Sequence, residues 1–147
     1  MKRSKRLKPV QNLAEQRRKS AEQQLGLAQQ QLSAERDKLV QLQTYLDDYQ
    51  QDLLTTGRAG VTMEQLQRLQ VFKQRLLDAV TQQQRQISFS EQLLEQAKLV
   101  WQTARGREQA MGSLISRTQE QERQQEEKGL QKQIDEMTQN RRGRGLL

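Results

Sequence analysis

The chain has 147 residues, of which 33% are hydrophobic and only 3% aromatic, and it carries a formal net charge of +7. It lacks cysteine and histidine, which excludes disulfides, thiolate metal sites and histidine-based acid–base catalysis. So little apolar material cannot fill a globular core of normal thickness, and the single proline favours helix over sheet. We therefore expect a soluble, cytoplasmic all-α protein whose long helices bury a narrow seam, with no membrane-spanning segment.

A basic segment over residues 1–9 leads into the first predicted helix, over residues 10–56. From Leu25 onward, apolar or small residues recur at alternating steps of three and four, with Glu35 as the one polar exception. These seam positions are Leu25, Ala28, Leu32, Leu39, Leu42, Leu46, Tyr49 and Leu53. A repeat sustained over this length is typical of a coiled coil.

The stretch TTGRAGVT interrupts this repeat and predicts a tight turn over residues 57–61. Gly57 follows the last seam residue of the first helix, where a left-handed residue commonly ends a helix. Thr62 and Gln65 then have the spacing of a capping box, which starts a second helix. Because a link of about five residues joins helices that run back alongside each other, the stretch indicates a corner rather than a flexible hinge.

The second predicted helix is longer, over residues 62–137, and its seam continues in the same rhythm. The apolar or small positions are Leu66, Leu69, Leu76, Val80, Ile87, Leu94, Ala97, Trp101, Ala104, Met111 and Ile115. After about residue 115 the sequence becomes charged and glutamine-rich, which predicts a frayed or overhanging helix, with a permanently packed segment as the alternative. A basic disordered tail is expected over residues 138–147.

The two repeats also predict a register. If the chain reverses near residue 59, residues that face each other across the seam have numbers that add to about 118 or 119. This register pairs apolar residues with apolar ones, and it pairs Glu35 with Gln83, which are expected to hydrogen-bond. It also places Arg18 beside Trp101, as a candidate cation–π contact. A parallel dimer would not require such matching, so the sequence predicts a long antiparallel two-helix coiled-coil hairpin within one chain.

Most of the aromatic residues gather near the turn. Tyr45 and Phe72 occupy g positions of the heptad beside the seam residue Tyr49, and the g positions of two antiparallel helices share one flank. This flank is expected to present an aromatic strip, either as a docking site or as a thickening of the thin seam. The opposite end carries both basic termini and is expected to meet an acidic protein, nucleic acid or anionic lipid, or simply to be solvated.

No pattern of catalytic residues is present in the sequence. There is no glycine-rich phosphate-binding loop, and the carboxylates are scattered along exposed helix faces with no enclosed site. We expect the chain not to be an enzyme and to bind neither a cofactor nor a metal.

The basic start, the two long glutamine-rich helices and the short turn before mid-chain resemble the flagellar export FliJ family. The most telling stretches are YLDDY before the turn and QVFKQRLLDAV after it. The resemblance implies a stalk-like coiled coil that sits in the hexameric ring of the export ATPase FliI and links it to the export-gate membrane protein FlhA. It also implies a peripheral association with the inner membrane at the flagellar base, and flagellar export chaperones are further candidate partners.

In the family, the gate-binding surface is a patch near the turn. Its pattern is matched here by Leu42, Tyr45, Tyr49, Phe72, Leu76 and Ala79. Lys38 and Gln83 depart from the family pattern at the edges of the patch, so that fringe is not carried over. The stalk resemblance also implies that the basic end contacts the ATPase ring, and the candidate residues are Arg6, Arg17, Arg18, Trp101, Arg105 and Arg117.

A second class of function remains open from the residues alone. A strongly basic coiled coil is also expected of a protein that binds nucleic acid or the ribosome. A zipper-type DNA reader needs a long basic helix that leads into a parallel seam, and Pro9 and the reversed register argue against it. The stalk and adaptor of flagellar export is therefore the leading hypothesis, and nucleic acid is not expected as a partner.

Overall fold

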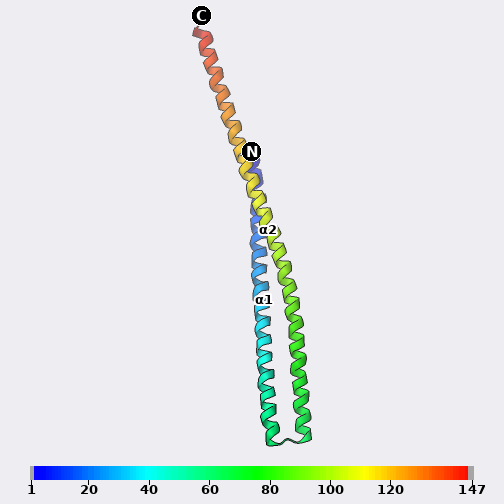
Figure 1. The fold of residues 1–147 in the computed structure, drawn as a ribbon. Helices are drawn as coiled ribbons and strands as arrows, with labels where there is room; N and C mark the ends of the chain where they lie inside the picture. Colours follow the sequence, from blue (N-terminus) through cyan, green and yellow to red (C-terminus); the bar gives the residue numbers. More distant parts are fainter. Residues whose placement is uncertain (1, 146–147) are drawn as a thin grey trace. The chain divides into compact units, whose positions relative to one another are not determined.

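The computed structural model describes residues 2–145, which form two α-helices joined by a short connection (Figure 1). α1 spans Arg3–Ala59 and α2 spans Met63–Gly145. No strand occurs among these described residues. The helices pack against each other, so the prediction of an all-α helical hairpin is confirmed.

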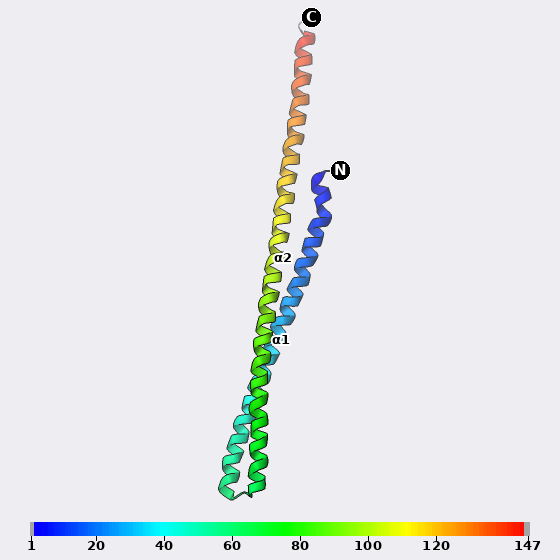
Figure 2. The same cartoon turned by 90° about the vertical axis from the view of Figure 1, so that its right-hand side faces the viewer.

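The chain divides into two compact units, and each unit contains part of both helices. The first, here called the turn unit, is Ala21–Trp101, and the second, the terminal unit, consists of Met1–Ser20 and Gln102–Leu147. Within the turn unit the two helices run side by side away from their connection (Figure 2). Neither helix contains, within the part of the chain that is described, a stretch long and apolar enough to cross a membrane.

Both helices bury one narrow stripe of residues spaced alternately three and four apart, as a coiled coil requires. In α1 the buried and half-buried positions recur from Ser4 to Leu53, and in α2 they recur from Leu69 to Glu122. The most deeply buried seam residues are Ser4, Ala21, Leu32, Glu35, Ser90, Ile115 and Thr118. Because only this stripe is buried, a chain with few apolar residues can still form long packed helices.

The register of the turn unit agrees with the prediction. Gln83 Nε2 donates a hydrogen bond to the Glu35 carbonyl oxygen at 2.8 Å and another to the Glu35 carboxylate. The Tyr49 hydroxyl donates to the carbonyl oxygen of Leu69. In both pairs the residue numbers add to 118, and the predicted Glu35–Gln83 hydrogen bond is confirmed.

Some polar contacts in both units join residues whose numbers add to a larger value. In the terminal unit Arg18 Nε lies 2.7 Å from Glu108 Oε2, and Ser4 contacts Glu122, so both pairs add to 126. In the turn unit Arg36 lies 3.6 Å from Glu91, a pair that adds to 127. Side chains on a helix lean toward its N-terminus, and in an antiparallel pair this lean raises the numbers of residues whose side-chain ends meet.

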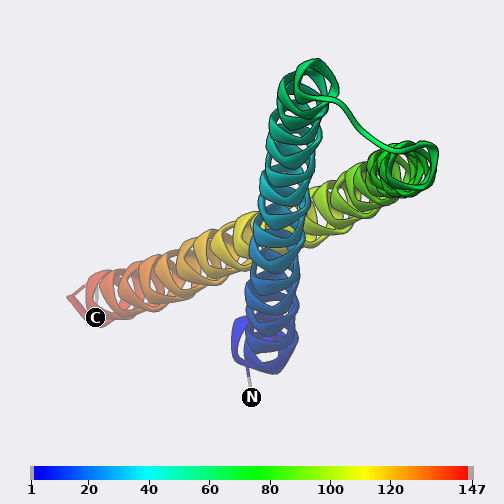
Figure 3. The same cartoon turned by 90° about the horizontal axis from the view of Figure 1, so that it is seen from below.

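The turn differs from the prediction at its first glycine. α1 continues through Gly57 to Ala59, and it is Gly60 that has a left-handed backbone, with a φ of 88°. The two residues between the glycines are good helix formers, and a helical glycine costs only about 1 kcal/mol relative to alanine, so the helix extends to the second glycine. The Thr62 N–H donates to Gln65 Oε1 and the Gln65 N–H donates to Thr62 Oγ1, both at 3.2 Å. The predicted capping box is therefore confirmed. It lies where the connection seen in Figure 3 leads into α2.

α1 begins at Arg3 rather than at residue 10, and it passes through Pro9. Proline lacks an N–H and commonly interrupts a helix. Contacts with α2 outweigh this local preference, because Ser4 is only 7% exposed and both its N–H and its hydroxyl donate to the Glu122 carboxylate. Most of the predicted basic segment is therefore helical.

The seam of α2 extends past residue 115, where the sequence predicts fraying. Ile115 and Thr118 are only 5% and 4% exposed, so this stretch is packed. All residues over 123–143 are exposed, and the end of α2 extends past the first residues of α1 (orange to red in Figures 1 and 2). The overhang thus begins after Glu122. A disordered tail was expected from residue 138, but α2 remains helical to Gly145. Residues 146–147 of that tail lie outside the described residues.

Candidate functional site

Two aromatic rings, one from each helix, contact each other near the turn. Tyr49 of α1 and Phe72 of α2 have ring centroids 4.8 Å apart and an interplanar angle of 59°, a tilted arrangement that aromatic pairs favour. Tyr49 is half-buried, and its hydroxyl donates to the Leu69 carbonyl oxygen. Burial raises the pKa of the Tyr49 hydroxyl above its usual value, which adds to its preference for the neutral form.

The aromatic strip predicted from the sequence divides into seam residues and exposed residues. We keep this name for the six residues Leu42, Tyr45, Tyr49, Phe72, Leu76 and Ala79. Tyr45 is 59% exposed and Phe72 is 48% exposed, whereas the other four are half-buried. Tyr49 therefore thickens the seam, as the alternative interpretation expects, while Tyr45 and Phe72 present apolar surface to solvent.

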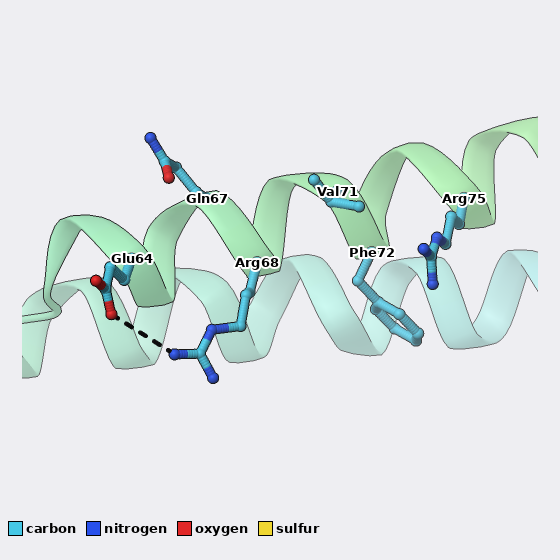
Figure 4. Close-up of a pocket in the computed structure, with 6 residues that line it drawn as sticks. All are labelled: Glu64, Gln67, Arg68, Val71, Phe72 and Arg75. Carbon is cyan, nitrogen blue, oxygen red and sulfur yellow. Dashed lines mark ion pairs between the residues drawn. The ribbon is translucent and has the colours of Figure 1, made fainter.

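A shallow hollow of about 520 Å³ lies on α2 beside Phe72. Its lining residues are Glu64, Gln67, Arg68, Val71, Phe72 and Arg75. Arg68 forms an exposed ion pair with Glu64 at 3.9 Å. In Figure 4 the side chains of Glu64, Arg68 and Phe72 lie on one side of α2, and Gln67 points away. Arginine and apolar groups together suit a partner segment that carries acidic and apolar side chains.

Sequence reasoning identified only Phe72 among the residues that line this hollow. Arg68 and Arg75 are spaced four before and three after Phe72, which places all three on one face of α2. Val71 is 54% exposed and lines the same hollow. A search limited to apolar heptad positions leaves such neighbours out, whereas the helical spacing around Phe72 would have found both arginines.

Two of the predicted ring-contact residues, Arg6 and Arg17, lie on one exposed face of α1. The spacing of residues 6, 10, 13 and 17 places Val10 and Leu13 between them on the same face. These two apolar side chains are each 46% exposed. We call these four residues the arginine stripe, because it combines positive charge with apolar surface in the terminal unit.

The other predicted ring-contact residues are placed differently. Arg18 is part of the seam, where its guanidinium pairs with Glu108 and both side chains are partly buried, at 24% and 29% exposure. Trp101 is a half-buried seam residue in the turn unit, and Arg105 and Arg117 are exposed on α2. Arg6 and Arg17 therefore share one exposed face of α1, whereas the Arg18 guanidinium is paired with Glu108 across the seam.

Four residues, Lys2, Ser4, Glu122 and Glu126, tie the start of α1 to α2, and we call them the terminal clamp. The Ser4 N–H donates to Glu122 Oε1 at 3.1 Å, the Ser4 hydroxyl donates to Glu122 Oε2 at 2.8 Å, and Lys2 forms an ion pair with Glu126. The first turn of α1 contains no acidic residue. The negative charge that favours a helix N-terminus is therefore supplied by α2.

The clamp shifts the pKa values of its own members. The hydrogen bond from the Ser4 N–H lowers the pKa of the Glu122 carboxyl, and the Ser4 hydroxyl adds to this effect. The hydrogen bond with Glu126 raises the pKa of the Lys2 ammonium. Both shifts favour the charged forms, so the clamp is an electrostatic contact that holds the first turn of α1 in its helical form.

The geometry described above can be compared with known protein families. Over residues 3–146, the chain matches the family described as flagellar FliJ protein. The match spans both helices, the turn, the aromatic strip and the arginine stripe. No curated protein and no solved structure matches the chain. Because the family match covers nearly its whole length, this chain belongs to the flagellar FliJ protein family.

Proposed function

We propose that this chain is a non-enzymatic stalk and adaptor of the flagellar type III protein export apparatus, where it links the hexameric export ATPase FliI to the export-gate membrane protein FlhA. Family membership gives it a role in flagellar biogenesis and protein export. The proposal adds the two partners and the linking function. It also implies a cytoplasmic protein attached to the inner membrane at the flagellar base through its partners, with export chaperones as further ligands.

The aromatic strip supports the assignment of the gate contact. Tyr45 and Phe72 are large, exposed and close to the turn, and Arg68 and Arg75 border Phe72 on the same face. Tyrosine and arginine are enriched among the residues that dominate binding energy at interfaces. The contact with Tyr49 restricts the Phe72 ring before any partner binds, which lowers the entropy lost on docking.

The arginine stripe supports the assignment of the ATPase contact to the terminal unit. Arg6 and Arg17 supply positive charge, while Val10 and Leu13 supply apolar area that is buried when a partner docks. The surface of a partner that complements this stripe has an acidic rim around an apolar centre. The strip and the stripe belong to different units of the chain, and the proposal assigns each to a separate partner.

The alternative function, nucleic-acid or ribosome binding, depends on the net charge of +7 alone. The strip provides an aromatic surface for a protein partner, and the family match favours export. Binding to RNA or duplex DNA that falls steeply with added salt, without binding to FliI or FlhA, would favour the alternative.

The double variant Tyr45→Ala with Phe72→Ala tests the proposed gate contact. Each large side chain that becomes buried on docking contributes on the order of 2 kcal/mol. Loss of both therefore weakens FlhA binding by a few hundredfold or more, at about 1.4 kcal/mol per tenfold change. Both residues lie outside the seam, so the helical circular dichroism signal is expected to stay unchanged. Binding to FlhA and to FliI is measured by calorimetry or surface plasmon resonance.

A matched control removes the same kind of surface from the other side of α1. Val40 and Leu54 are 60% and 67% exposed, and they lie outside the strip. The double variant Val40→Ala with Leu54→Ala is expected to bind FlhA as the unmodified chain does. If the strip variant kept its affinity for FlhA, or if both double variants lost it equally, the strip would not be the gate contact.

A further inference from the structure

The exposed overhang of α2 carries an apolar stripe that has no counterpart in the hairpin. Leu130, Ile134 and Met137 are 60%, 48% and 60% exposed. Their spacing of four and three places them on one face of the helix. A helix that presents one apolar face to water normally packs that face against another element.

This stripe is not a continuation of the hairpin seam. The seam repeat passes through Ile115, Thr118 and Glu122, and its next two positions are Gln125 and Gly129. Neither residue supplies apolar surface, so the stripe belongs to a separate repeat that is rotated around α2. A second repeat of this kind points to a different packing partner from α1.

The second repeat is close to symmetric about Ile134, because the residues equally placed on its two sides have numbers that add to 267 or 268. Its five positions are Glu127, Leu130, Ile134, Met137 and Arg141, at steps of three, four, three and four, and all five are exposed. If two copies of this segment align antiparallel with Ile134 against Ile134, then Leu130 faces Met137 and Glu127 faces Arg141. Apolar side chains meet in the middle, and opposite charges meet at both ends.

We propose that the overhang is a self-association site at which a second copy of this chain docks antiparallel around Ile134. The contact is isologous, because each copy contributes the same patch. Charge complementarity at the ends selects this register against a parallel one, in which Glu127 would face Glu127 and Arg141 would face Arg141.

The contact is weak and depends on concentration. Two short helical segments bury less than the about 1,200 Å² of a standard stable interface. Glu127 also pairs with Arg123 of its own helix at 2.9 Å, with both side chains largely exposed. An exposed pair of this type contributes little to stability, so Glu127 can exchange Arg123 for Arg141 of the second copy.

A cysteine at the symmetry position tests the geometry directly, because the natural chain contains no cysteine. Ile134→Cys is expected to form a disulfide-linked dimer of the full chain under mild oxidation, since only this position of the repeat faces itself. Val100→Cys, 60% exposed on the same helix, is the control for random collision. Equal rates of dimer formation for the two variants would overturn the proposal.

Sedimentation equilibrium of the full chain over a wide range of concentration tests the energetics. The unmodified chain is expected to show a monomer–dimer equilibrium, which Ile134→Glu abolishes and Val100→Glu leaves unchanged. Glu127→Arg sets like charges against each other at both ends and is expected to weaken the dimer at least tenfold. Adding Arg141→Glu restores opposite charges and the dimer. A chain that stays monomeric throughout, or a double variant that fails to recover although its helical signal is intact, would refute the proposal.

Discussion

Ile115 lies where the sequence predicts fraying and the structure shows packing, so its truncation tests how far the hairpin extends. The side chain is only 5% exposed. Ile115→Ala removes three carbons, and at about 0.8 kcal/mol per buried methylene the transfer term alone is about 2.4 kcal/mol. A two-helix seam relaxes around a cavity more readily than a globular core does. We therefore expect a loss of about 2–3 kcal/mol in the free energy of unfolding, near the low end of the ~2–5 kcal/mol range for such truncations.

Urea unfolding followed by circular dichroism measures this loss, and Ile134→Ala is the matched control. Ile134 is the same residue type on the same helix but is 48% exposed. At a protein concentration too low for self-association through the overhang, its truncation is expected to change stability by no more than about 0.5 kcal/mol. Hydrogen exchange over residues 102–122 then shows whether the loss is local to the terminal unit. If Ile115→Ala were as mild as Ile134→Ala, the seam would end before Ile115 and the packing described here would be incorrect.

Three further predictions address the register, the terminal clamp and the arginine stripe. Cysteines that replace Leu32 and Ile87 are expected to crosslink within one chain at low protein concentration, and purely intermolecular products would contradict the hairpin. The depressed pKa of Glu122 means that its contribution to stability is complete above its unfolded pKa of about 4.3 and is lost as the pH falls through the lower folded pKa. The Glu122 carboxyl should therefore titrate below that value by NMR, and a midpoint at or above it would exclude the clamp. Arg6→Glu with Arg17→Glu is expected to abolish stimulation of the ATPase FliI while FlhA binding persists, and unchanged stimulation would remove the stripe from the ATPase contact.

Features that depend on local sequence were predictable. The capping box of Thr62 and Gln65 was identified because its partners lie three residues apart in one segment. The Glu35–Gln83 hydrogen bond followed from matching two heptad repeats about the turn. The left-handed glycine was predicted at Gly57, and this was wrong: it is Gly60. The two glycines have the same local preference, and the helix formers Arg58 and Ala59 between them carry α1 on to the second one.

Features that depend on contacts between distant segments escaped sequence reasoning. Residues 1–9 were predicted to be a basic segment before the first helix, but the terminal clamp stabilises a first turn there through Glu122, more than a hundred residues away. The polar seam residues Thr118 and Glu122 do not resemble a hydrophobic repeat, so the seam was predicted to weaken after Ile115. They are buried or half-buried because hydrogen bonds satisfy them: the Thr118 hydroxyl donates to the Leu114 carbonyl oxygen, and Glu122 accepts from α1.

Part of the candidate site could be predicted, because it follows from the local heptad repeat. Tyr45 and Phe72 were identified because heptad g positions border the seam, and the structure leaves both exposed. The charged border formed by Arg68 and Arg75 was missed because arginine is common throughout this sequence and only its position beside Phe72 makes it informative. Arg18 was assigned to a partner surface, but Glu108 occupies a seam position within its reach and pairs with it.

The proposed link between the ATPase and the export gate through one chain can be tested by a bridging assay. FlhA is immobilised and incubated with FliI in the presence and absence of this chain, and the retained FliI is quantified. We predict that FliI is retained only when the chain is present, and that Tyr45→Ala with Phe72→Ala abolishes this retention although the variant still co-purifies with FliI. Equal retention of FliI without the chain, or a chain that binds one partner only by releasing the other, would show that the chain is not the link.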